Sequence, residues 1–165
     1  MSVVQTIAGA VQPWADFYAH HKLVSAAVIW AHLSALVLGG GTAIASDRMV
    51  LRLDGADTEE RKRRLHDFSS THRVVITALT VSAVTGASLL MSDVKTFLVS
   101  PVYWTKMGLI LLLLINGYAL LHTERGLGAD PSPTNPLWKR FAYGAAASIM
   151  LWLSTTLAGV VLLNS

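Results

Sequence analysis

The sequence predicts an all-α integral membrane protein whose single domain (1–165) is a bundle of four transmembrane helices. Three observations support this prediction: four long stretches without Asp, Glu, Lys or Arg, a mean hydropathy of +0.50, and a charged fraction of only 14%. Each stretch reaches or approaches the roughly 20 residues that an α-helix needs to cross about 30 Å of hydrocarbon. The stretches are rich in Leu, Ala and Val and do not alternate with period two, so we expect helices rather than barrel strands.

A short interfacial helix is expected before the first span, over about residues 10–22. This segment mixes the aromatic residues Trp14, Phe17 and Tyr18 with polar ones, a composition that is typical of a helix lying at the membrane surface. No basic region with an apolar core and a small-residue cleavage pattern precedes it, so we expect no removable signal peptide.

The four spans are built around the uncharged stretches 23–46, 74–92, 107–123 and 141–165. With their flanking residues, the expected helices cover about 23–50, 58–92, 102–124 and 137–163. Asp57, followed three residues later by Glu60, resembles a capping box and predicts the start of the second helix. A Pro-rich turn (GADPSPTNP, 128–136) separates the last two helices, and Trp138 is placed to anchor the fourth helix at the interface.

The net charge of +3 and the pI near 9.5 reflect topology, because the basic residues are divided unequally between the two sides of the membrane. The first and third connections are flanked by Arg48, Arg52, Arg61, Lys62, Arg63, Arg64, Arg73, Arg125, Lys139 and Arg140. The opposite side has only Lys22, Lys95 and Lys106. By the positive-inside rule, both termini face the non-cytoplasmic side. We therefore expect the lipid bilayer, and no nucleic acid, as a partner.

The chain contains no cysteine, which excludes disulfides, thiolate-bound iron–sulfur clusters and covalently attached c-type haem. A redox cofactor would therefore be held by His or Met. No Ser-His-Asp arrangement, membrane-embedded carboxylate pair or phosphate-binding glycine loop is recognisable, so no residue is predicted as catalytic. The sequence leaves open whether the protein is an enzyme.

Three histidines lie inside or at the edge of the predicted spans. At about 1.5 Å per residue, His72 and His122 lie level near the cytoplasmic boundary, whereas His32 lies about 22 Å from Asp47 toward the outer face. Ionisable side chains in lipid are usually functional or paired, which makes His32 the strongest candidate. The alternative for His32 is a buried hydrogen bond to a hydroxyl or carbonyl group, and for the other two it is a solvated boundary position.

Two histidines at equal depth on different helices suit haem b, whose iron takes axial nitrogens from both faces of the ring. His72 and His122 meet this requirement by height, and Arg73 is placed to pair with a haem propionate. A His/Met pair is the other possibility, because Met150 on the fourth helix lies at a height similar to that of His32.

The first helix also carries a narrow stripe made of His32, Gly39, Ala43 and Asp47. A flat porphyrin or a neighbouring backbone fits against such a stripe, and close helix packing is the simpler explanation of the triple glycine at 39–41. A metal site is a competing interpretation, because His32, His72, His122 and Asp47 together offer nitrogen and oxygen ligands for zinc, iron or copper.

Three segments together resemble a known group of proteins. They are HLSALVLGGGTAIASDR in the first helix, THRVVITALTVSAVTGASLL in the second and YWTKMGLILLLLINGYALLH in the third. Over about residues 27–125, they resemble the four-helix bacterial membrane proteins grouped around the copper-resistance D domain and the HemJ-type protoporphyrinogen oxidases. The resemblance implies a multi-pass protein of the bacterial inner membrane.

In HemJ-type proteins a first-helix His and a third-helix Lys are functional and haem b is bound, and the matching positions here are His32 and Lys106. After His32, a triple glycine and Asp47-Arg48 replace the usual aromatic-to-arginine run. The resemblance therefore implies haem or porphyrin binding more than protoporphyrinogen oxidation. From its surroundings alone, Lys106 is better explained as a snorkelling lysine beside Tyr103 and Trp104.

The leading hypothesis is a haem-b membrane protein for electron transfer or tetrapyrrole handling, with His32, His72 and His122 as candidate ligands. The second is a cofactor-free accessory subunit that packs its glycine faces against a larger respiratory or photosynthetic membrane complex. The third is transport of a metal or small solute, which would require a homo-oligomer because four helices are few for a channel.

Overall fold

Four long helices dominate the computed structural model, which describes residues 3–53 and 57–164. The helices are α1 (Val3–His20), α2 (Lys22–Leu51), α3 (Thr58–Ser92), α4 (Val94–Val99), α5 (Pro101–Ala129) and α6 (Leu137–Leu163). By length and hydropathy, α2, α3, α5 and α6 can each cross a membrane. This confirms the prediction of an all-α protein with four candidate spans. Helix α5 continues to Ala129, five residues beyond the end expected from the sequence.

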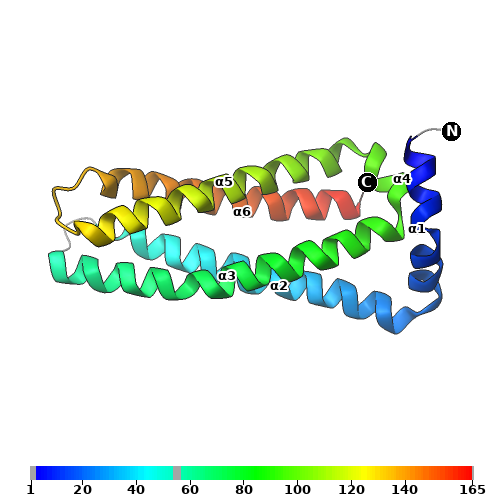
Figure 1. The fold of residues 1–165 in the computed structure, drawn as a ribbon, viewed down its shortest axis with the longest axis horizontal. Coiled ribbons are helices and arrows are strands. Elements are labelled where there is room, and N and C mark those ends of the chain that lie inside the picture. The colour runs from blue at the N-terminus through cyan, green and yellow to red at the C-terminus, as the bar shows by residue number, and fades with distance from the viewer. Residues whose placement is uncertain (1–2, 54–56, 165) are drawn as a thin grey trace.

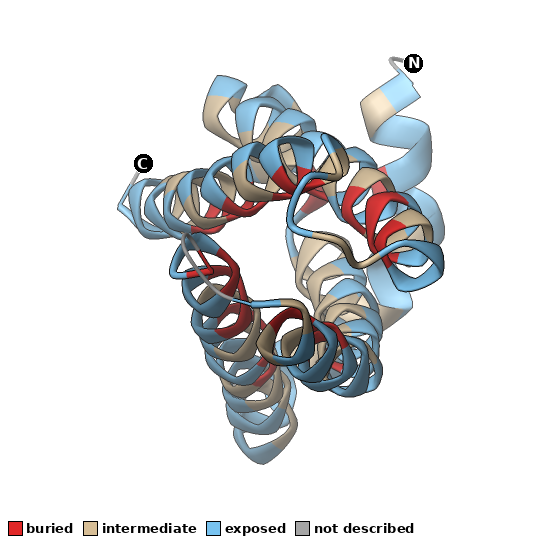
Figure 2. Cartoon of the chain, turned by 90° about the vertical axis from the view of Figure 1, so that its left-hand side faces the viewer, coloured by how far each residue is buried: buried red, intermediate tan, exposed pale blue. Residues whose placement is uncertain are grey.

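The four long helices form two antiparallel pairs, α2 with α3 and α5 with α6 (Figure 1). The pairs meet chiefly where α2 packs against α6, whereas α3 and α5 touch much less. Helix α1 lies across one end of the bundle, where it packs against α3 and α4 (Figure 1). We call this the α1 end, and we call the opposite end, where α2 connects to α3 and α5 connects to α6, the loop end. Seen from the loop end, the buried residues lie on the inner sides of the helices (Figure 2).

Side-chain caps mark several helix ends. The Asp57 carboxylate accepts a hydrogen bond from the Glu60 backbone N–H at 2.8 Å, which confirms the predicted cap at the start of α3. Asp93 caps α4 in the same way by accepting from the Thr96 N–H. At the turn before α6, the Trp138 indole N–H donates to the Ser132 carbonyl at 3.0 Å, so this tryptophan closes the loop from inside the protein.

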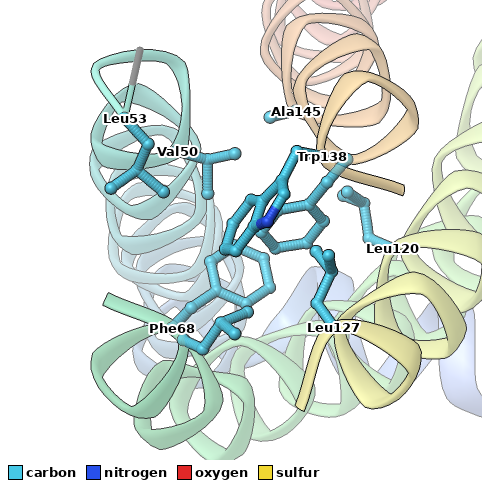
Figure 3. Close-up of a cluster of buried hydrophobic side chains, with 9 residues drawn as sticks. Val50, Leu53, Phe68, Leu120, Leu127, Trp138 and Ala145 are labelled. Atoms are coloured by element: carbon cyan, nitrogen blue, oxygen red, sulfur yellow. The ribbon is translucent and has the colours of Figure 1, made fainter. Parts of the chain in front are cut away.

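The hydrophobic core is concentrated at the loop end (Figure 3). Phe68 and Phe141 meet edge to face at 5.0 Å, and Leu127 beside them is completely buried. The Arg61 guanidinium lies 4.7 Å from the Trp138 ring, which is a cation–π contact. These aromatic side chains of α3 and α6, together with Leu127 of α5, close this end of the bundle.

Glycines bring the helices together at mid-bundle. A Cβ atom on Gly39 would lie 2.8 Å from the Ala78 Cβ atom, and one on Gly40 would lie 3.0 Å from the Trp152 ring. Trp152, from α6, is 5% exposed, so the indole fills the space that the two glycines leave. Gly39, which belongs to the first-helix stripe, and its neighbour Gly40 are therefore packed against neighbouring helices.

Candidate functional site

Ionisable side chains lie inside the bundle in two layers. One layer, toward the α1 end, contains His32 and Lys106. The other, toward the loop end, contains Asp47, His72 and Glu124. Charged or titratable groups are expensive in a membrane interior, so both layers are candidate functional sites.

The ring of His32 is held by two oxygen atoms of α3. Its Nδ1 lies 2.9 Å from the Thr85 hydroxyl oxygen and 3.1 Å from the Ser82 carbonyl oxygen. The Thr85 hydroxyl itself donates to the Val81 carbonyl at 2.7 Å, so its oxygen is an acceptor toward His32. With two acceptors beside it, Nδ1 carries the proton and donates. Among the described residues Nε2 has no hydrogen-bond partner, so its lone pair is free to bind a ligand.

Lys106 completes this layer from the opposite side of the bundle. Its helix, α5, lies diagonally across from α2, and Lys106 and His32 interact electrostatically across the interior. Both side chains lie against glycines. A Cβ atom on Gly159 would be 3.3 Å from the Lys106 Nζ, and one on Gly86 would be 3.2 Å from the His32 Cε1. We call the group of His32, Ser82, Thr85, Gly86, Lys106 and Gly159 the His32–Lys106 site.

A further polar atom lies near this site on α6. The Thr155 side chain is 4% exposed, and its hydroxyl has no hydrogen-bond partner among the described residues. Thr155 precedes Gly159 by four residues and therefore lies on the same helix face, about 6 Å along the axis from the glycine that Lys106 contacts. An unpartnered buried hydroxyl is unfavourable, which indicates that this part of the interior is suited to a polar ligand group or a water molecule.

The second layer begins with Asp47, which is 2% exposed. Its carboxyl group accepts a hydrogen bond from the Ser148 side chain of α6, while Oδ2 lacks a partner among the described residues. Next to it, the hydroxyl groups of Ser46 and Thr71 lie 3.0 Å apart and link α2 to α3. The partner of the Asp47 carboxyl group on α6 is therefore a hydroxyl group rather than a metal-binding side chain.

His72 is paired with Glu124. Its Nε2 lies 3.5 Å from the Glu124 Oε2, a distance and orientation that give an electrostatic contact but no hydrogen bond. Its Nδ1 lies 3.3 Å from the Ser69 carbonyl, and its ring meets Phe68 edge to face at 5.0 Å. The imidazole is thus engaged by neighbouring groups on α3 and α5.

The structure does not bring His72 and His122 together. His122 is exposed on α5, two residues before the buried Glu124 that contacts His72, so the two imidazoles lie on different sides of that helix. Arg73 is exposed as well. Met150 is 64% exposed, so its side chain points away from the interior where His32 lies.

The predicted metal ligands are also dispersed. Within residues 3–53 and 57–164, no three His, Asp or Glu side chains come close enough to hold a metal ion. His32 and Asp47 lie in different layers, and His122 faces outward. The space beside Gly39, predicted to lie against a porphyrin or a backbone, is filled by Ala78 and Trp152.

The structure confirms the expected alternative for His32, a hydrogen bond to a hydroxyl and a carbonyl group, but the sequence did not indicate which residues supply them. Ser82, Thr85 and Gly86 fall on one face of α3 because they are spaced three and four residues apart. The available signal was the run of Ser, Thr and Gly inside an otherwise apolar span (TVSAVTGAS, 80–88), since small and polar residues in a transmembrane helix often face another helix. Glu124 as the partner of His72 gave no comparable signal.

The fold and the two layers define a class: a four-helix, multi-pass membrane protein with ionisable groups in its interior. The chain matches no protein-family model, no curated protein and no solved structure.

Proposed function

We propose that the protein binds haem b at the His32–Lys106 site and takes part in electron transfer or tetrapyrrole handling in the membrane. The observation that carries this proposal is the arrangement of His32. Its Nδ1–H is tied to a backbone carbonyl and a hydroxyl oxygen, and its Nε2 is free. Histidines that bind metals typically donate their other ring N–H in this way, which fixes the ring and makes the ligating nitrogen more basic.

The residues of the His32–Lys106 site fit haem b chemically. His32 would supply a nitrogen ligand for the iron, and the Lys106 ammonium would pair with a propionate carboxylate. Gly86 and Gly159 reduce the bulk beside these two side chains. When bound, the haem iron supplies a one-electron redox couple, while this chain's residues orient the ligand and exclude water.

The same geometry favours His32 over the pair His72 and His122. To hold one iron together, both imidazoles would have to reach the same point, whereas His72 is engaged by Glu124 and His122 is exposed. His32 and Lys106 are also the two positions that match functional residues in the HemJ-type pattern.

We also propose that the loop end faces the cytoplasm of a bacterial inner membrane, with both termini on the other side. The basic residues around the two connections support this orientation through the positive-inside rule. Helix α1 would then lie at the outer interface, since it crosses the α1 end and exposes both polar and aromatic side chains (Figure 1).

The test is a reduced-minus-oxidised visible spectrum of the detergent-purified protein, with a pyridine haemochrome assay for stoichiometry. We expect a haem-b α-band that is lost in His32→Ala and kept in His122→Ala, the matched control, because His122 is exposed. An α-band that survives in His32→Ala would overturn the ligand assignment. A preparation that stays colourless with excess haem would contradict haem binding and favour an accessory subunit, which should co-purify with a larger complex.

A further inference from the structure

A groove lies between α5 and α6, in the half of the bundle toward the loop end. It has a volume of about 300 Å³, and its lining includes Asn116, Thr123, Arg140, Tyr143, Gly144 and Ala147. It runs over about 10 Å along each helix, because Asn116 and Thr123 on α5, like Arg140 and Ala147 on α6, are seven residues apart.

Small side chains create the groove, and a hydrogen bond maintains it. The Asn116 side-chain N–H donates to the Gly144 carbonyl at 3.0 Å, which holds α5 and α6 together. A Cβ atom on Gly144 would lie 2.8 Å from the Leu120 Cδ2, so the helices are already in close contact there. The groove is therefore a depression in a tightly packed helix pair rather than a gap between loose helices.

The groove opens to the outside of the bundle. Tyr143 on its edge is 77% exposed, and Ala147 is exposed as well. Helix α6 turns a different side toward α2, so α2 does not cover the groove between α5 and α6. For a chain whose apolar helices contact lipid, the groove faces the acyl chains of one leaflet.

One end of the groove is basic. Arg140 is exposed, and within the described residues 3–53 and 57–164 it forms no ion pair; neighbouring Lys139 is also exposed. Both cations lie at the start of α6, whose first turn contains no acidic residue. The positive end of the helix dipole disfavours cations and favours an anion there.

We propose that this groove binds an anionic phospholipid, with one acyl chain along Gly144 and Ala147 and the headgroup phosphate at Arg140. Arginine binds phosphate with charge-assisted hydrogen bonds, and basic pockets between transmembrane helices at the membrane boundary are suited to anionic headgroups. A second copy of the chain fits the groove less well, because it would bring another Arg140 of the same charge toward the same end.

The test is native mass spectrometry of the full-length protein in detergent, titrated with phosphatidylglycerol or phosphatidylcholine. We expect adducts of phosphatidylglycerol in preference to phosphatidylcholine. Arg140→Gln should lower the apparent affinity for phosphatidylglycerol about fivefold by removing one cation near the surface. The matched control is Arg48→Gln, an exposed arginine at the loop end of α2, which should leave the affinity unchanged.

A second variant tests the groove independently of charge. Ala147→Leu keeps Arg140 and fills the groove, so it should also reduce the adducts. If Arg140→Gln and Arg48→Gln lowered the affinity for phosphatidylglycerol equally, the lipid would be attracted by the overall positive charge, and the site would be overturned. Equal adducts of both lipids would overturn the preference for an anion. A lipid-free dimer that Ala147→Leu disrupts would identify the groove as a contact between two copies and overturn lipid binding.

Discussion

At the scale of single residues, the ring of His32 is oriented by acceptors that belong to another helix. The two acceptors, the Ser82 carbonyl and the Thr85 hydroxyl oxygen, both lie on α3. A buried ring N–H with two acceptors has one favourable orientation, and losing an acceptor costs about 0.5–1.5 kcal/mol for a neutral hydrogen bond. The proposed ligand is therefore positioned before any cofactor binds.

Thr85→Val tests this orientation, because it keeps the side-chain shape and removes the hydroxyl oxygen. We expect haem affinity to fall about tenfold, as when an outer partner of a metal-binding histidine is lost. The measurement is a spectroscopic haem titration of the apoprotein. Thr80→Val is the matched control on the same helix, since the exposed Thr80 hydroxyl donates only to the Ile76 carbonyl. Equal effects of the two substitutions would contradict a role of Thr85 through His32.

Lys106 is tested by Lys106→Met, which removes the ammonium group and keeps much of the length. If the ammonium pairs with a propionate, the variant should bind haem more weakly. The His32 ligand is retained, so the α-band should persist at saturating haem. Lys95→Met is the control, because Lys95 is exposed on α4. Unchanged affinity in Lys106→Met would show that the lysine does not hold the cofactor.

At the scale of helices, the first two residues of the triple glycine let α2 approach two neighbours, α3 at Gly39 and α6 at Gly40. Gly39 and Gly40 are buried against Ala78 and Trp152, whereas Gly41 is exposed and a Cβ atom there would meet nothing within 4 Å. Three adjacent glycines thus differ in what they do. Two allow contact with neighbouring helices, and the third carries only the cost of glycine in a helix.

Gly39→Ala and Gly41→Ala should change stability in opposite directions. Gly39→Ala forces the new methyl group against the Ala78 Cβ, so we expect a loss of about 1–3 kcal/mol from overpacking. Gly41→Ala has free space and gains helix propensity, so we expect stabilisation of up to about 1 kcal/mol. Thermal unfolding in detergent, followed by circular dichroism, measures both. Similar shifts in the two variants would contradict the packing role of Gly39.

At the scale of the whole molecule, the apolar surface lies mostly on the outside. In an apolar stretch of 18 residues within α3, only 6% of the residues are buried inside the protein. The interior contains the hydrophobic core at the loop end, small side chains where helices meet, and the polar layers around Asp47 and His32. This distribution suits a lipid solvent, in which helices associate through close packing and polar contacts rather than through the hydrophobic effect.

The proposed orientation is testable by cysteine labelling, because the chain has no native cysteine. Gln12→Cys places a thiol on an exposed position of α1, and Lys62→Cys places one on an exposed position at the loop end of α3. In intact cells, a membrane-impermeant maleimide should label Gln12→Cys alone. After lysis it should label both. Labelling of Lys62→Cys in intact cells would reverse the orientation.

The sequence by itself determined the number of long helices, their approximate bounds and the cap at Asp57. Span length and hydropathy depend on local composition, and a capping box depends on residues three positions apart, so neither requires knowledge of the neighbours. Only the tertiary structure decided which polar side chains meet: His32 with Thr85, and His72 with Glu124 rather than His122. The rotation of each helix about its own axis decides those contacts. That rotation depends on packing between helices distant in sequence, as at Gly39 and Trp152.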